Sequence, residues 1–135
     1  MTRRSRLAVG LLVLLAVATG FGLVAFAGSR CPAELPGQPC PDAGMNQAIV
    51  IGLAALAVGW ATAAFAYLAE AALRRSIVYR GAWTRAARRG VLLAALVAVL
   101  GGLRLGGALS PAGALFVMIL TGVVEWSAVR WLDRP

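Results

Sequence analysis

The feature that most constrains the fold is a long apolar run near the start of the chain. Leu7 to Gly28 contains 22 residues without a charged side chain. A helix of this length rises by about 1.5 Å per residue and extends about 33 Å, enough to cross a hydrocarbon core of about 30 Å. The run therefore predicts a transmembrane helix at about 7–28.

Three later stretches, at about 47–73, 91–109 and 112–132, are similarly long and apolar. The chain is 61% hydrophobic and 13% charged, with a mean hydropathy of +0.83, whereas an ordinary soluble domain carries about 25% charged residues. A soluble fold of this size would expose large adhesive patches to water. We therefore expect a single all-α integral membrane domain, 1–135, folded as an antiparallel bundle of four transmembrane helices.

The first run has a second interpretation as a cleaved signal peptide. Basic residues (Arg3, Arg4 and Arg6) precede it, and Ala25-Phe26-Ala27 has the small-x-small pattern of a cleavage site. The apolar core of a signal peptide is usually about 7–15 residues long, so the longer run favours a retained helix.

The distribution of arginine predicts the orientation in the membrane. Arginine supplies every cation, since the 13 basic residues include no lysine and the chain has no histidine. The segment 74–90 and both chain ends are rich in arginine, whereas the segment 29–46 has only Arg30. Short arginine-rich segments stay in the cytoplasm, so both termini are expected inside and 29–46 outside. The composition, rich in arginine, alanine and glycine, suggests a bacterial inner membrane.

The segment 74–90 is predicted to be a cytoplasmic loop that anchors the chain at the membrane surface. Its arginines flank apolar runs, so we expect them to contact anionic lipid headgroups rather than nucleic acid. The aromatic residues Tyr79, Trp83, Trp126 and Trp131 would lie at headgroup depth on the same side. The arginines of this predicted anchor are Arg74, Arg75, Arg80, Arg85, Arg88 and Arg89.

Small residues and turn residues suggest how the spans pack and begin. Small residues recur every four positions in the second span (Ala55, Gly59, Ala63), the third (Gly102, Gly106) and the first (Ala16, Gly20), and such strips let helix backbones approach closely in lipid. Asn46 is a plausible N-cap for the second helix. Ser110-Pro111 has the N-cap and first-position residues of a fourth helix.

Cys31 and Cys40 are the two cysteines of the chain, and both lie in the proline-rich segment 29–46. The exported side of a membrane is oxidising, so a disulfide that ties this loop is expected. Redox catalysis is an alternative, but it typically uses a tight Cys-x-x-Cys with a second pair. Two thiols without histidine cannot supply the four ligands of a zinc site.

The charged residues within the predicted spans that are candidates for a role in the membrane or at its surface are Glu70, Arg104 and Glu125. Glu70 precedes Arg74 by one helical turn, in the order that favours an ion pair. Arg104 lies near the outer turn, where its side chain can extend to the headgroups. Charges inside a membrane are functional hypotheses by default.

Glu125 needs a partner, because it lies about 20 Å below the outer turn by the helical rise and far from Arg104. Arg88 or Arg89 at the base of the third span, or Arg74 or Arg75, would be at a suitable depth. The alternatives are a protonated carboxyl, since burial raises the pKa of a carboxyl group, a contact with another subunit, or a proton- or ion-coupled role.

The sequence contains no catalytic motif that identifies an enzyme, and it has no histidine to hold haem or metal. We expect no cofactor. The favoured function is a non-catalytic accessory or scaffolding subunit of a membrane assembly, either a homo-oligomer or a larger complex. The alternative is a small oligomeric transporter or channel, for which the spans supply little polar lining.

Overall fold

The computed structural model describes residues 3–31, 40–73 and 82–132, and all the regular structure in these residues is helical. Each of the four helices is long and apolar enough to cross a membrane. The predicted all-helical class with four candidate membrane spans is confirmed. The helices are α1 (Arg3–Ser29), α2 (Ala43–Leu73), α3 (Ala82–Leu105) and α4 (Pro111–Leu132).

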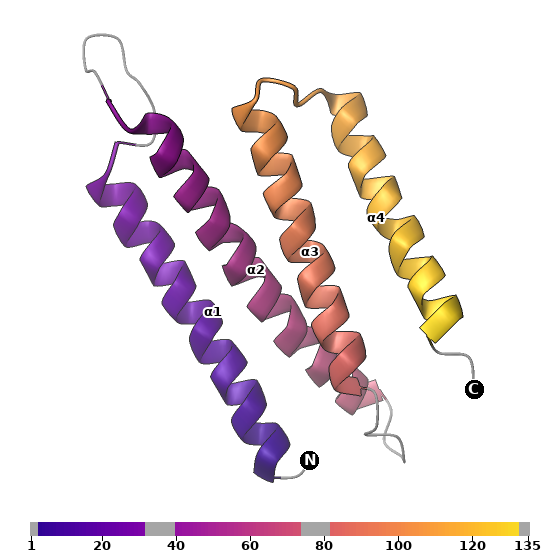
Figure 1. The fold of residues 1–135 in the computed structure, drawn as a ribbon. Helices are drawn as coiled ribbons and strands as arrows, with labels where there is room; N and C mark the ends of the chain where they lie inside the picture. Colours follow the sequence, from indigo (N-terminus) through magenta and orange to yellow (C-terminus); the bar gives the residue numbers. More distant parts are fainter. Residues whose placement is uncertain (1–2, 32–39, 74–81, 133–135) are drawn as a thin grey trace.

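The helices stand side by side in chain order, and neighbours run in opposite directions (Figure 1). In the described part of the chain, backbones come close between α1 and α2, between α2 and α3, and between α3 and α4, and between no other pair of helices. A closed bundle would also bring α1 against α4. The expected bundle is therefore not confirmed, and α1 and α4 form the two edges of an open row.

The surface of this row is largely apolar. Large side chains such as Phe21 (74% exposed), Phe65 (73%) and Trp131 (80%) point away from the protein. Water would be a poor solvent for this surface, whereas hydrocarbon suits it. The structure is therefore consistent with a multi-pass membrane protein.

The tightest contact in the row lies between α2 and α3. A Cβ atom added to Gly90 would lie 2.7 Å from the carbonyl oxygen of Gly59 and 2.9 Å from the Cβ of Ala63. Ala55, Gly59 and Ala63 are all buried. The small strip predicted on the second span therefore does mediate close packing, since only small side chains allow this approach.

The partner strip on α3 differs from the predicted one. A Cβ at Gly102 would meet nothing within 4 Å, and one at Gly106 would meet only backbone atoms close to it in the chain. Gly90, Ala94 and Gly101 face α2 instead. Gly90, Ala94 and Gly101 are four and seven positions apart along the chain. At this spacing they lie on one face of α3, which is the face that packs on α2.

The third helix begins at Ala82 rather than at Val91, so the second half of the predicted loop 74–90 is helical. Ala82 and Ala86 are buried, and the Trp83 ring stacks on Tyr67 with 4.4 Å between ring centroids. This packing extends the helix across a stretch that its arginines made look like a loop.

The third helix ends at Leu105 rather than at Leu109. Ala108 N donates to the Leu103 carbonyl (2.9 Å) and Gly107 N to the Arg104 carbonyl (3.1 Å), which is a Schellman motif. Gly107 has a φ of +67°, a conformation that glycine adopts without strain.

The starts of α2 and α4 test the two predicted caps. The Asp42 carbonyl accepts a hydrogen bond from Asn46 N (2.9 Å), so Asp42 takes the N-cap position and the prediction of Asn46 is wrong. The prediction for α4 is confirmed: Ser110 Oγ accepts a hydrogen bond from Gly113 N (3.0 Å), directly before Pro111 opens the helix.

Candidate functional site

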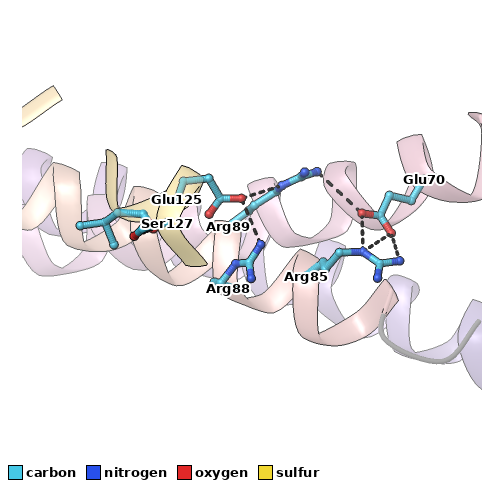
Figure 2. Close-up of polar contacts among 7 residues, drawn as sticks. Glu70, Arg85, Arg88, Arg89, Glu125 and Ser127 are labelled. Carbon is cyan, nitrogen blue, oxygen red and sulfur yellow. Dashed lines mark hydrogen bonds and ion pairs between the residues drawn. The ribbon is translucent and has the colours of Figure 1, made fainter. Parts of the chain in front are cut away.

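Five charged side chains form a continuous network at the end of the row where α2 ends and α3 begins (Figure 2). We call this the ionic network. It links the two glutamates that lie within the described helices to arginines on one face of α3. Its members are Glu70 on α2, Arg85, Arg88 and Arg89 on α3, and Glu125 on α4.

The first half of the network joins α2 to α3. Arg85 Nε lies 3.2 and 3.3 Å from the two carboxylate oxygens of Glu70, and Arg85 Nη2 lies 3.1 Å from Oε2. This is the bidentate fork that guanidinium and carboxylate groups favour. The Arg85 and Glu70 side chains are 18% and 15% exposed, so they are screened far less than a surface pair.

The second half joins α3 to α4. Arg89 Nε donates to Glu125 Oε1 at 3.2 Å, and Arg88 Nη2 approaches the same oxygen at 3.5 Å. Arg89 Nη1 also lies 3.8 Å from Glu70 Oε1, so Arg89 bridges the two carboxylates. Three helices are thereby connected through one arginine.

The spacing of the arginines explains how one helix serves both carboxylates. Arg85, Arg88 and Arg89 lie at positions i, i+3 and i+4, which share one face of an α-helix. Because α2, α3 and α4 run antiparallel to their neighbours, this face of α3 lies opposite Glu70 on α2 and opposite Glu125 on α4 (Figure 2). The i, i+3, i+4 spacing of these arginines is present in the sequence, but it places them on one face only if 82–90 is helical.

Two predicted partners of Glu125 are present, whereas the described partners of Glu70 were not predicted. Glu125 contacts Arg88 and Arg89, two of the four candidates. Glu70 was expected to pair with Arg74, which lies outside the described residues, and Arg85 was not predicted. Arg74, Arg75 and Arg80 of the predicted anchor all lie outside the described residues.

Not every polar atom of the network is satisfied within the described residues. Glu125 Oε2 and Arg88 Nε are buried without a hydrogen-bond partner there. The same holds for the hydroxyl of Tyr67, which is 1% exposed. Such atoms are costly in an apolar setting, so they mark places where a further group can bind.

A hollow of about 250 Å³ borders the network between α2, α3 and α4. We call it the α3–α4 hollow. The wall on α3 combines Arg89 with two leucines, and on α4 Thr121 and Gly122 lie beside Glu125. Its lining comprises Thr62, Arg89, Leu92, Leu93, Thr121, Gly122 and Glu125.

Arg104 lies at the opposite end of α3, away from the ionic network. It lies in the last turn, where a cation interacts favourably with the helix dipole. No ion pair to Arg104 occurs in 3–31, 40–73 or 82–132, and its side chain borders a hollow of about 340 Å³ beside Gln47 and Gly101. That its side chain reaches the headgroups stays a prediction.

Cys31 and Cys40 are joined as a disulfide, with 6.2 Å between their Cα atoms. The bond ties the end of α1 to the residues that precede α2, and Asn46 Nδ2 adds a hydrogen bond to the Cys31 carbonyl at 3.2 Å. The disulfide that the sequence predicts is therefore present. Among the described residues, no group of three or more His, Cys, Asp or Glu side chains could hold a metal ion.

The aromatic residues predicted at headgroup depth have two different environments. Trp83 packs on Tyr67 inside the row, whereas Trp126 and Trp131 are exposed on α4. The guanidinium of Arg130 lies 4.2 Å from the centre of the Trp126 ring, a cation–π contact. Tyr79 lies outside the described residues.

Comparison with protein families, curated proteins and solved structures found no match to this chain.

Proposed function

We propose that this chain is a small multi-pass protein of the bacterial cell membrane and a non-catalytic accessory or scaffolding subunit of a membrane assembly. Both termini and the segment 74–90 lie in the cytoplasm, and 29–46 lies outside. This orientation is supported by the positions of the arginines: those of the ionic network, the start of α1 and the end of α4 share one end of the row (Figure 1).

The ionic network is the observation that carries the proposal. Its two glutamates are held by arginines of a neighbouring helix, at 3.1 Å for Glu70 and 3.2 Å for Glu125. A carboxylate that carries protons or ions exchanges its partner during the cycle, whereas a structural carboxylate keeps one. Contacts that join α2, α3 and α4 favour the structural role.

The two edges of the row supply surfaces for assembly. None of the described side chains of α4 is buried, and α1 buries only Ser5 and Val9. Both helices therefore have free faces along most of their length, on which a helix of another subunit can pack.

Purification from the native membrane tests the proposal. The tagged chain is extracted in a mild detergent, its complex is sized, and co-purifying proteins are identified. We expect a species larger than the single chain, with a second protein or further copies in fixed ratio. An unrelated four-span protein with the same tag is the control. Recovery of the chain as one monomeric species would contradict the proposal.

A small oligomeric transporter or channel is the second candidate, because Thr62, Thr121 and Glu125 give the α3–α4 hollow some polar lining. Flux measurements in liposomes distinguish the two functions. The scaffolding proposal predicts no flux of protons, common ions or cationic drugs above that of empty liposomes. Flux that depends on Glu125 would instead support transport.

A further inference from the structure

The α3–α4 hollow is a gap that the protein does not fill. A Cβ atom added to Gly122 would meet nothing within 4 Å, and the hollow continues between Leu92 and Leu93 of α3 and Thr121 of α4. Protein interiors are close-packed, and an empty gap loses the dispersion contacts of its lining. In a bilayer, a lipid acyl chain is available to fill such a gap.

The mouth of the hollow carries excess positive charge. The ionic network holds three guanidinium groups and two carboxylates, which leaves one positive charge uncompensated. Arg89 borders the hollow and its side chain is 44% exposed. It uses Nε toward Glu125 and Nη1 toward Glu70, so Nη2 has no partner among the described residues.

The carboxylate of Glu125 also borders the hollow and would repel an anion by itself. Two guanidinium groups lie 3.2 and 3.5 Å from its Oε1, which offsets that charge. Arg88 Nε is buried and has no hydrogen-bond partner within 3–31, 40–73 and 82–132. The local field at the mouth is therefore positive, which suits a phosphate group.

We propose that an anionic phospholipid of the inner leaflet occupies this site, with its phosphate on Arg89 and one acyl chain between α3 and α4. The positive charge at the mouth favours an anionic headgroup, and the apolar gap favours an acyl chain. The lipid stabilises the position of α4, which otherwise contacts the other helices through the ionic network and the short turn after α3. This site rests on the proposed membrane orientation but not on the proposed scaffolding function.

Lipid binding to the purified full-length chain tests the site. Native mass spectrometry of delipidated protein is titrated with phosphatidylglycerol, with phosphatidylcholine of the same chain length, and with soluble glycerol 3-phosphate. We expect phosphatidylglycerol to bind at least about tenfold more tightly than phosphatidylcholine, because both lipids carry a phosphate but the choline cation of phosphatidylcholine weakens its attraction to a positive site. Glycerol 3-phosphate should bind weakly, because it lacks the acyl chain.

Two variants separate the headgroup contact from the chain contact. Arg89→Gln should weaken phosphatidylglycerol binding about tenfold and should weaken phosphatidylcholine binding less, because the choline cation already offsets the charge of its phosphate. Gly122→Leu should fill the gap and weaken both lipids without altering any charge. Gly102→Leu is the matched control, because its Cβ also meets open space but lies outside the hollow, and it should bind as the wild type does.

Three outcomes would overturn the proposal. Equal affinity for the two lipids would show that the site does not select an anionic headgroup. Wild-type binding by Gly122→Leu would place the acyl chain elsewhere. Glycerol 3-phosphate that binds as tightly as phosphatidylglycerol would define a site for free phosphate rather than for lipid.

Discussion

At the scale of single residues, each glutamate of the ionic network contacts two of the described arginines, and Arg89 contacts both glutamates. Glu70 contacts Arg85 and Arg89, and Glu125 contacts Arg88 and Arg89. Removal of one carboxylate would leave partly buried guanidinium groups without a counter-charge, which is more costly than the net value of the pair. The network therefore holds the helices in register.

The pair formed by Arg85 and Glu70 should show strong energetic coupling. In a double-mutant cycle with Glu70→Gln and Arg85→Gln, we expect a coupling free energy of about 2 kcal/mol, because the contact is bidentate and largely shielded. The measurement is chemical unfolding of each variant in one detergent. Purely additive effects of the two substitutions would show that the contact contributes nothing to stability.

The partners of Glu125 could be predicted from the sequence, whereas the contact of Glu70 with Arg85 was not predicted. Depth along the fourth span was enough to place Glu125 near Arg88 and Arg89. Glu70 has a basic neighbour one turn away, so a local pair with Arg74 was the simplest prediction. Its contact with Arg85 depends on where α3 begins and on the geometry of the turn, and neither follows from spacing alone.

At the scale of helices, the contact between α2 and α3 depends on glycine. Gly59 and Gly90 allow the two backbones to approach so closely that a methyl group on Gly90 would lie 2.7 Å from a carbonyl oxygen. In lipid, where apolar side chains gain nothing by leaving water, such close packing is a main source of helix association.

The substitution Gly90→Ala should therefore destabilise the protein, although alanine is the better helix former. The gain in helix propensity is about 1 kcal/mol, and the overpacking costs about 1–3 kcal/mol. We expect a net loss of about 1 kcal/mol in the free energy of unfolding. Gly102→Ala, on an open face of the same helix, should be neutral or stabilising. Stabilisation by Gly90→Ala would contradict the close contact.

A helix boundary could be predicted from the sequence only where residues adjacent to that boundary determine it. Ser110 and Pro111 marked the start of α4 correctly, because the cap is made by adjacent residues. The start of α3 was missed, because arginines resemble a loop until Ala82 and Ala86 pack against Tyr67. The end of α3 depends on Gly107 in a Schellman motif, and glycine is too frequent in this chain to identify that turn.

At the scale of the whole molecule, a covalent bond and ion pairs join neighbouring helices at the two ends of the row. The disulfide joins α1 to the start of α2 at one end, and the ionic network joins α2, α3 and α4 at the other. A short turn connects α3 to α4 at the disulfide end. Among neighbouring helices, α3 and α4 have the weakest contact, and the α3–α4 hollow lies between them beside the ionic network.

Reduction of the disulfide should lower stability without unfolding the protein. In the chain-entropy model, closure of a loop of about ten residues contributes about 2.7 kcal/mol. We expect the Cys31→Ser, Cys40→Ser double variant to lose about that amount in unfolding free energy. Reductant should lower the stability of the wild type and leave the double variant unchanged. Equal stability of oxidised and reduced wild type would contradict the structural role.

The four spans and their alternating direction could be predicted from the sequence, but the open row could not. Length and hydropathy are enough to identify each span. Each span is apolar on nearly all sides, so no amphipathic face indicates which neighbour it packs against. The edge positions of α1 and α4 therefore appear only in the structure.

The central claim is that the charges within the spans hold the helices together. Its most direct test is the unfolding free energy of Glu125→Gln relative to wild type in the same detergent. We predict a loss of about 2 kcal/mol, whereas the control Arg104→Gln, outside the ionic network, should unfold like the wild type. Unchanged stability of Glu125→Gln, with a flux in liposomes that the variant abolishes, would contradict the account.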